Sequence, residues 1–259
     1  MSTTAPEHFN AIADQYAASE VHANSPTIRR LHDLLGPKRP DSICEVACGP
    51  GHLALSFAGK ASRIVGVDAA PNMLRQFERL AQERGVKVET VHADVGSMPL
   101  LSNSFAVVVS RLAPHHFPDA ANAVREMTRL AKPRGCVAVI DLEGNEDPKL
   151  DDLNHKIELL HDPSHVRSYT AAHWRELFEL NGLTIEALET RQTELPGGLT
   201  IRRWCEIGST APEAQKKIRA LLAAAPREHL VGLGIQFANG EFSIPVRTLI
   251  ILGRKGRGI

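Results

Sequence analysis

A glycine-containing loop and two aspartates carry the clearest chemical signal in the sequence. A short apolar run leads into Glu45-Val-Ala-Cys-Gly49-Pro-Gly51, where the glycines allow a tight turn and close approach to a ligand. Asp68 ends the next apolar run and Asp94 ends the one after it. The first carboxylate can accept both hydrogens of a ribose diol, and the second can accept from an adenine amine. An isolated aspartate there is usually a helix cap, but two at equivalent places predict a nucleotide-binding site.

A second group of reactive side chains follows the fourth apolar run, in Arg111-Leu-Ala-Pro-His115-His116-Phe117. A histidine suits general-base chemistry because its pKa lies near neutral pH. Adjacent side chains diverge by about 100° on a helix or point to opposite faces of a strand. Only one of His115 and His116 is therefore expected to face a reacting group. A structural role, in capping the next helix or packing on Phe117, stays open for either histidine.

The stretch 162–169, DPSHVRSY, is a third candidate site. His165 and Arg167 are candidates to hold an anionic or carbonyl-bearing substrate, and a solvated loop is the alternative interpretation. His161 and His165 stand four residues apart, an interval that suits zinc on a helix. Pro163 breaks the helical register between them and no third ligand is evident, so no metal site is predicted.

The composition limits the classes of partner. Among 259 residues, 30 Lys and Arg balance 30 Asp and Glu, so no net charge attracts nucleic acid or an anionic membrane. A small-molecule partner is expected instead. No segment approaches the roughly 20 consecutive apolar residues that span a bilayer. The N-terminus carries no apolar signal, and four cysteines without a CxxC pair fit the cytoplasm.

Alternation of short apolar runs with helical stretches predicts the elements that position these residues. Strands are expected at 42–47, 62–67, 86–93, 105–110 and 136–142, with helices at 52–59, 71–84 and 119–131. Such β-α alternation indicates an α/β fold with parallel strands and helices on both faces. The ligand should then lie beyond the carboxyl ends of the strands. Pro133-Arg134-Gly135 is expected to turn the chain into the fifth strand.

The flanking regions complete this sheet. Two amphipathic helices are expected at 5–18 and 25–35, further helices at 147–161, 169–181 and 212–224, and strands at 183–190 and 242–255. We predict a seven-stranded sheet with an antiparallel last strand. The expected division is a helical N-terminal cap (1–40), a core (41–142) and a C-terminal part (143–259) that completes the sheet and covers the substrate pocket.

In combination, these motifs resemble the class I S-adenosylmethionine-dependent methyltransferases of the methyltransferase domain 11 type, especially the ubiquinone/menaquinone branch. The resembling segments are EVACGPG (45–51), GVDAAPNML (66–74), ADVGSMPL (93–100) and SFAVVVSR (104–111). The likeness covers about residues 9–142 and implies a Rossmann-like fold that binds S-adenosylmethionine. Ala47 departs from the family, since many relatives have a glycine there; alanine is tolerable if its φ stays negative.

The resemblance also assigns roles to residues. It places Glu45, Gly49 and Gly51 around the methionine part of the coenzyme, Asp68 at the ribose, and Asp94 with the Val95 backbone at the adenine. The segment FNxxAxxY (9–16) would close over the coenzyme and carry Tyr16 toward the methyl group. The remaining residues expected to contact the coenzyme are Ala47, Ala69, Met73 and Ser110.

Methyl transfer from a sulfonium is an in-line displacement that needs no metal, so positioning and desolvation supply most of the rate. A general base helps if the acceptor must lose a proton. We favour His115 as that base, because relatives more often keep a histidine there, and place it within about 4 Å of the space beyond the methyl group. His116 would turn away into the helix behind. Arg111 is a further candidate. The accepting atom (C, O or N) and the acceptor stay open, and a homodimer is possible.

Two rival interpretations fit parts of this pattern. A nicotinamide-dependent oxidoreductase could use the same loop as GxGxxA, through Gly49, Gly51 and Ala54. Glu45 before the loop, Asp94 after the third strand and the strand near the C-terminus argue against it. The other rival is a non-catalytic protein that binds S-adenosylmethionine, against which the histidine-rich edge argues.

Overall fold

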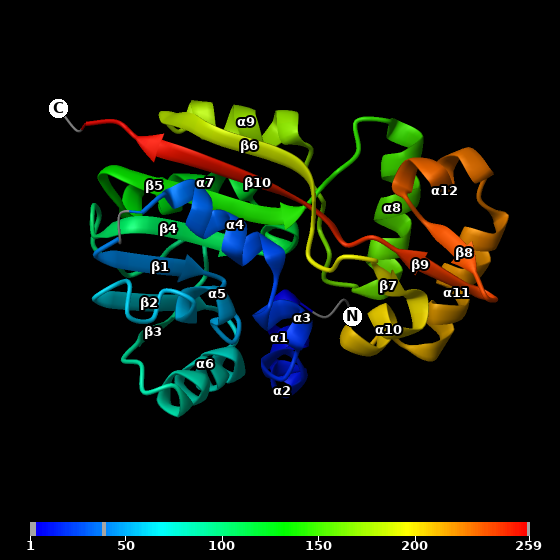
Figure 1. The fold of residues 1–259 in the computed structure, drawn as a ribbon, viewed down its shortest axis with the longest axis horizontal. Coiled ribbons are helices and arrows are strands. Elements are labelled where there is room, and N and C mark those ends of the chain that lie inside the picture. Colours follow the sequence, from blue (N-terminus) through cyan, green and yellow to red (C-terminus); the bar gives the residue numbers. More distant parts are fainter. Residues whose placement is uncertain (1–3, 38–39, 258–259) are drawn as a thin grey trace.

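The computed structural model of the chain describes residues 4–37 and 40–257, and a seven-stranded sheet forms its larger part (Figure 1). The strand order is β3-β2-β1-β4-β5-β10-β6. In chain order the strands are β1 (Ser42–Val46), β2 (Arg63–Asp68), β3 (Glu89–His92), β4 (Phe105–Arg111), β5 (Ala131–Leu142), β6 (Leu183–Thr193) and β10 (Arg247–Lys255). Strands β1 to β5 pair in parallel, and β10 pairs antiparallel with both β5 and β6. The predicted sheet is confirmed.

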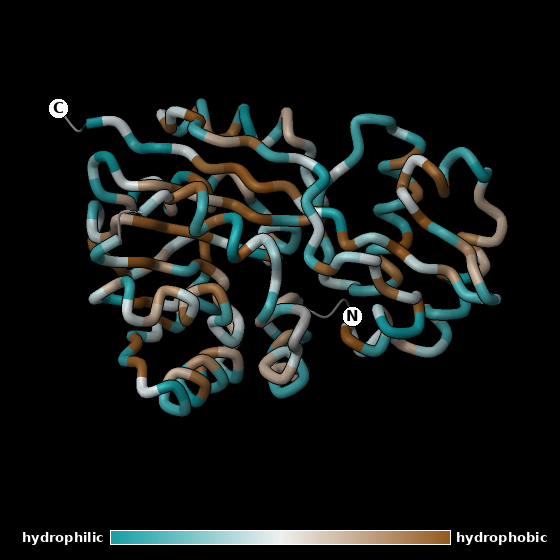
Figure 2. Tube along the Cα trace, in the orientation of Figure 1, coloured by the Kyte–Doolittle hydropathy of each residue, from teal (hydrophilic) through white to brown (hydrophobic). Residues whose placement is uncertain are grey.

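Helices cover both faces of this sheet. On one face α4 (Pro26–Leu35), α5 (His52–Leu55) and α6 (Pro71–Glu83) pack on the strands around Leu31, Leu53 and Phe77. On the other face α7 (Ala120–Leu130) and α9 (Ala171–Leu180) pack around Met127 and Trp174. Central strands buried on both faces need mainly apolar side chains, which explains the brown stretches along these strands in Figure 2.

Three short helices precede α4, where the sequence predicted one helix over 5–18. They are α1 (Ala5–Ala11), α2 (Ala13–Ala17) and α3 (Glu20–Ala23), and the first two lie against α6. Asn10 accepts a hydrogen bond from the backbone N–H of Asn72 at 2.8 Å, and Asp14 accepts from the side chain of Gln76 at 2.7 Å. These contacts hold the N-terminal segment beside the carboxyl ends of β1 and β2.

The C-terminal module, defined as α8 (Pro148–His161) together with residues 195–246, has a hydrophobic core of its own. It contains a three-stranded sheet in the order β7-β9-β8, built from β7 (Leu199–Thr200), β8 (Gln236–Ala238) and β9 (Glu241–Ile244). Its other helices are α10 (Ile201–Ile207), α11 (Pro212–Ala224) and α12 (Arg227–Leu233). In Figure 1 it lies at the right, facing the carboxyl ends of the parallel strands.

The predicted single strand over 242–255 is wrong in one respect. Strand β9 belongs to the small sheet and β10 to the large one, and Pro245 lies between them, where it has no N–H to give to either ladder. Arg247 at the start of β10 pairs with Thr193 at the end of β6, so the chain leaves and re-enters the large sheet at one place.

Other boundaries also differ from those expected. Strand β5 begins at Ala131 rather than 136, because the chain passes through Pro133-Arg134-Gly135 with a register shift and Arg134 at φ 62° instead of turning away. Strand β3 begins at Glu89 and α5 ends at Leu55, so both are shorter than predicted. Within the described residues, no helix is long and apolar enough to cross a membrane.

Candidate active site

The loop after β1 is tightly wound. Ala47, Gly49 and Gly51 all have positive φ, at 52°, 50° and 75°. The expectation that Ala47 keeps a negative φ is therefore wrong: an alanine occupies a left-handed conformation that favours glycine. At Gly51 no side chain would fit, because a Cβ atom would lie 2.1 Å from the Phe77 ring.

Asp68 closes this loop from the end of β2. Its Oδ2 accepts from the Gly49 N–H and its Oδ1 from the Ala70 N–H, both at 2.8 Å. Burial raises the pKa of Asp68, while these backbone donors act to lower it. Each carboxylate oxygen keeps a further lone pair, so Asp68 can accept from a ligand while it holds the loop.

Glu45 and Asp94 also have defined partners. Glu45 on β1 is buried, and its Oε2 accepts from the Ala54 N–H of α5 at 2.8 Å. Burial raises the pKa of Glu45 to about 8. Asp94, just after β3, accepts from the Gly96 N–H at 2.7 Å. Both carboxylates therefore stiffen the site before any ligand binds.

These residues surround a cavity of about 650 Å³, here called the coenzyme cavity. The predicted residues that line it are Tyr16, Glu45, Ala47, Gly49, Asp68, Ala69, Met73, Asp94, Val95, Arg111, His116 and His165. Gly51 shapes the loop without lining the cavity. Ser110 does not reach it either: its side chain is fully buried, and its hydroxyl has no partner among the described residues.

The segment 9–16 lies along this cavity. Phe9 and Tyr16 both line it and contact each other edge to face, with ring centroids 5.4 Å apart. Tyr16 also lies against His22, at 4.7 Å between centroids. The predicted closing segment thus contributes two aromatic side chains to the lining of this cavity.

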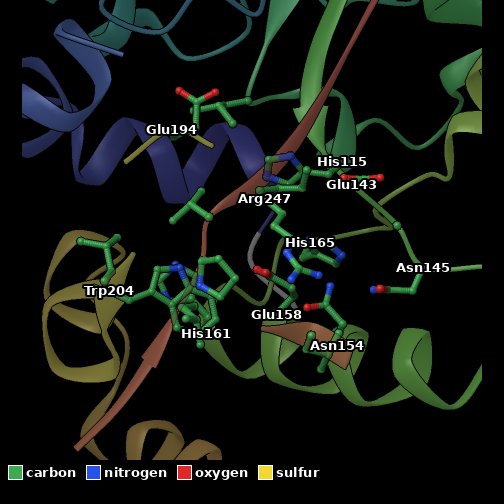
Figure 3. A pocket seen from close by; sticks show the side chains of 18 of the residues that line it. His115, Glu143, Asn145, Asn154, Glu158, His161, His165, Glu194, Trp204 and Arg247 are labelled. Carbon is green, nitrogen blue, oxygen red and sulfur yellow. The ribbon is translucent and has the colours of Figure 1, made fainter. Parts of the chain in front are cut away.

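A second cavity, of about 360 Å³, lies between the large sheet and the C-terminal module. It is here called the acceptor cavity, after the role proposed for it below. Figure 3 shows Trp204 and His161 at one side of it, and Glu143 and Asn145 at the other. The two cavities meet, since five residues line both: Tyr16, His22, Leu112, His116 and His165.

His115 lines the acceptor cavity from the 3-10 helix η1 (Pro114–His116). Its Nδ1 lies 2.6 Å from Oδ1 of Asp141, a fully buried residue near the end of β5. Burial alone would lower the pKa of His115, but the charge and hydrogen bond of Asp141, with Glu158 and Asp162, raise it above its usual value. An aspartate at Nδ1 fixes the proton there and leaves Nε2 as the basic nitrogen.

The prediction that His116 turns away into the following helix is wrong. His116 lines both cavities, and its ring lies 4.1 Å from that of His115 and 4.9 Å from that of Phe9. Both histidine rings line a cavity because the 3-10 turn lies where the two cavities join. Burial, with the charge of His115, lowers the pKa of His116 to about 3, so it stays neutral.

The two predicted arginines are both paired. Buried Arg111 donates to Oε2 of Glu194 at 2.5 Å and to the backbone oxygen of His22 at 3.2 Å. Glu194 also accepts from Ser25 and from Thr27, which ties α4 to the end of β6. Arg167 pairs with Asp151 at 2.7 Å and lines neither cavity. Neither guanidinium is thus left free to bind a substrate.

His165 lines both cavities, and its Nε2 is buried without a partner among the described residues. Burial, with the charges of neighbouring histidines, lowers the pKa of His165 to about 2. The neutral ring therefore offers one unused nitrogen where the cavities meet. In residues 4–37 and 40–257, no group of three or more His, Cys, Asp or Glu side chains is placed to hold a metal ion.

Sequence reasoning missed several residues of the acceptor cavity and its surroundings. Asp141 could have been found, because it follows the apolar run VAVI as Asp68 and Asp94 follow theirs. Glu158 and Trp204 carried no such signal, since only the folded C-terminal module brings them to the cavity. Glu194 follows β6 and reaches the cavity through its tertiary contacts with Arg111 and Thr27.

Comparison with known proteins agrees with this site. Residues 44–139 match the family model of the methyltransferase domain. The chain is 30% identical over 250 residues to YcgJ of Bacillus subtilis (strain 168), named as an uncharacterized methyltransferase, covering 95% of this chain and 97% of the relative. The crystal structure of YcgJ covers 90% of this chain and 99% of its own with a TM-score of 0.81 and 28% identity.

A demethylmenaquinone methyltransferase of Thermus thermophilus is 34% identical over 115 residues, which is 44% of this chain and 52% of the relative. A similarity that extends over nearly the whole length of YcgJ, together with the match to the methyltransferase domain, excludes the nicotinamide alternative. The chain is an enzyme of the class I S-adenosylmethionine-dependent methyltransferases.

Proposed function

We infer that this methyltransferase acts on a small molecule held in the acceptor cavity, with His115 as general base. The observation that carries this inference is the junction of the two cavities at Tyr16, His116 and His165. A methyl group presented from one cavity meets an acceptor in the other only at such a junction. The acceptor cavity, at about 360 Å³, has the size of a site for a small ligand.

The coenzyme cavity suits S-adenosylmethionine by its donors and acceptors. Asp68 has lone pairs for the two ribose hydroxyls, and Asp94 with Val95 would hold the adenine. Glu45, Ala47 and Gly49 lie where the methionine part would be held. When bound, S-adenosylmethionine supplies an electrophilic methyl group on a sulfonium. Tyr16 and Phe9 would exclude water from that group.

His115 is placed to take a proton from the acceptor. Asp141 holds its Nδ1, so Nε2 can receive the proton as the acceptor attacks. His116 and His165, both neutral, would orient the acceptor by hydrogen bonds at the junction. Arg111 serves as a positioning residue, because its ion pair with Glu194 secures the start of α4 and the end of β6.

Methyl labelling tests this function. The enzyme is incubated with methyl-tritiated S-adenosylmethionine and a cell extract separated into low-mass and macromolecular fractions. We expect label in the low-mass fraction, none with the Asp68→Ala variant, and undiminished labelling with Asp152→Asn, an exposed carboxylate on α8. Label found only in protein or nucleic acid would refute the small-molecule assignment.

A further inference from the structure

The acceptor cavity is lined by more carboxylates than cations. The carboxylates are Glu143, Glu146, Asp147, Glu158, Asp162 and Glu194, against two guanidiniums, Arg191 and Arg247. An excess of one sign in an enclosed site raises the local concentration of ligands of the opposite sign. The cavity therefore favours a cationic ligand over an anionic one.

Most of these carboxylates already have partners. Glu194 is paired with Arg111, and Asp162 accepts from the N–H and the hydroxyl of Ser164 at 2.8 and 2.7 Å. Glu143 accepts from the Arg191 N–H at 2.7 Å. Asp147 caps α8 by accepting from the Lys149 N–H.

Glu158 differs from these. Its carboxylate lines the cavity from the last turn of α8 and makes no hydrogen bond or ion pair with any residue in the described part of the chain. Glu146 is also unpaired there but is exposed to solvent. An unpaired carboxylate within a cavity costs free energy that a bound donor recovers.

The charge of Glu158 reaches the junction of the cavities. Burial, followed by the charges of Asp162 and Glu158, raises the pKa of the Tyr16 phenol. Burial also raises the pKa of Glu158 to about 7; His115 opposes this shift, and the charges of Asp162 and Asp141 add to it. The charges of Glu158 and His115 are thus felt at the junction of the two cavities, which Tyr16 lines.

The side of the cavity that holds Trp204 and His161 is largely apolar. Trp204 stacks on His161 with ring centroids 3.8 Å apart and an angle of 15° between the rings. Leu199, Leu233 and Ile244 of the module's core line the same side. This surface suits a flat, apolar body rather than a sugar or a phosphate.

We propose that the acceptor is an amine with an apolar, ring-containing body, and that Glu158 binds its ammonium group while the Trp204 side holds the ring. The proposal rests on the proposed function, because it assumes that the acceptor lies in this cavity. It differs from the anionic or carbonyl-bearing acceptor that His165 and Arg167 suggest in the sequence.

The chemistry of N-methylation fits these charges. The bound ammonium gives one proton to Nε2 of His115, and the freed nitrogen lone pair attacks the methyl carbon. The N–C bond forms as the C–S bond breaks, the electron pair of that bond stays on sulfur, and the positive charge passes from sulfur to nitrogen. Glu158 stabilises that charge as it arrives, whereas the same carboxylate would destabilise a developing oxyanion.

Three probes of similar shape test the class of acceptor: 2-phenylethylamine, 2-phenylethanol and 3-phenylpropionate. Each is titrated calorimetrically into enzyme saturated with S-adenosylhomocysteine. We expect the amine to bind at least about tenfold more tightly than the other two. Glu158→Gln should weaken amine binding at least about tenfold without weakening binding of the carboxylate. Asp152→Asn, which removes an exposed carboxylate from the same helix, should leave amine binding within about twofold.

Tighter binding of the alcohol or the carboxylate, no binding of any probe, or amine binding unaffected by Glu158→Gln would overturn the proposal. The proposed function is judged separately, by methyl transfer to any low-mass compound. If label enters a low-mass acid or alcohol but no amine, the small-molecule function stands and only the amine proposal fails.

Discussion

His115, in the 3-10 helix that follows β4, and Asp141, on the neighbouring strand β5, meet at the carboxyl edge of the sheet, with Nδ1 and Oδ1 2.6 Å apart. η1 follows β4, and Asp141 lies one residue before the end of β5, so the parallel pairing of β4 with β5 brings them together. Because both belong to the rigid core, the pair is positioned whether or not an acceptor is bound.

Replacing His115 tests the general base. In His115→Ala we expect turnover to fall by about 100-fold or more, because no group receives the proton, while affinity for S-adenosylhomocysteine stays within about twofold. The measurements are steady-state kinetics and calorimetry. Equal losses in His115→Ala and His116→Ala, accompanied by lowered melting temperatures, would instead indicate a structural role.

As the pH is lowered, the enzyme should lose activity at a higher pH than it would with a histidine of ordinary pKa as its base. The pKa of His115 is raised, so the base becomes protonated, and the rate falls, as the pH is lowered through a value above 6.5. In Asp141→Asn the neighbouring charge is gone and burial lowers the pKa of His115, so the half-maximal pH should move to lower values. A pH–rate profile that is the same in both proteins would contradict this role of Asp141.

Asp68→Ala tests the coenzyme site. The change would remove the two ribose contacts that we propose for Asp68 and the closure of the Gly49 loop. Affinity for S-adenosylhomocysteine should therefore fall by about 30- to 1000-fold, or about 2–4 kcal/mol. Calorimetric titration measures it, with Asp152→Asn as the control variant. Unchanged affinity in Asp68→Ala would remove this site assignment.

Arg111→Met should destabilise the fold. Glu194 would be left buried and unpaired, at a cost of about 3–5 kcal/mol in the free energy of unfolding. The double variant Arg111→Met/Glu194→Leu should recover most of that loss, which thermal and urea unfolding would measure. If the double variant is less stable than Arg111→Met alone, the isolated charge is not the cause.

The same ion pair makes stability depend on pH. Burial acts to raise the pKa of Glu194, but Arg111 and the hydroxyl donors hold it below its ordinary value of 4.5. The pair's contribution is therefore complete above pH 4.5 and is lost as the pH falls through the lower folded pKa. Between pH 7 and pH 3, Arg111→Met/Glu194→Leu should lose less stability than the wild-type enzyme. An equal loss in both proteins would exclude Glu194 as a source of the pH dependence.

Ala47→Gly should raise stability. An alanine in the left-handed conformation costs about 1–2 kcal/mol, and glycine would relieve this strain. Glycine also gives the unfolded chain more conformational entropy, which offsets part of the relief and leaves a net stabilisation of about 0.5–1 kcal/mol. We expect the melting temperature to rise by about 1–3 °C with coenzyme affinity within about twofold. A lower melting temperature would mean that the Ala47 methyl packs well enough to outweigh the strain.

The sequence predicts the core of this enzyme better than its acceptor side. The glycine loop, Asp68 and Asp94 are consecutive strand ends, so local pattern alone places them, and the lining of the coenzyme cavity follows. His116 lines a cavity because its 3-10 turn lies where two cavities join. The positions of His115 and His116 next to each other in the chain do not predict this. Glu194 and Arg111 are 83 residues apart and meet only through tertiary packing, so the sequence alone leaves the arginine as a candidate catalytic group.

The pairing of Thr193 with Arg247 gives the chain an insertion whose two ends touch. Most of the acceptor cavity's apolar side comes from inside that insertion, and the coenzyme cavity comes from outside it. Such an insertion can be lengthened, shortened or exchanged in evolution without a change in strand order, because its two ends are already neighbours in the large sheet. Relatives of one coenzyme chemistry can in this way come to hold molecules of different shape, and a chimera with another protein's insertion between Thr193 and Arg247 would change the apolar side of the cavity while His115 and Glu158 stay in place.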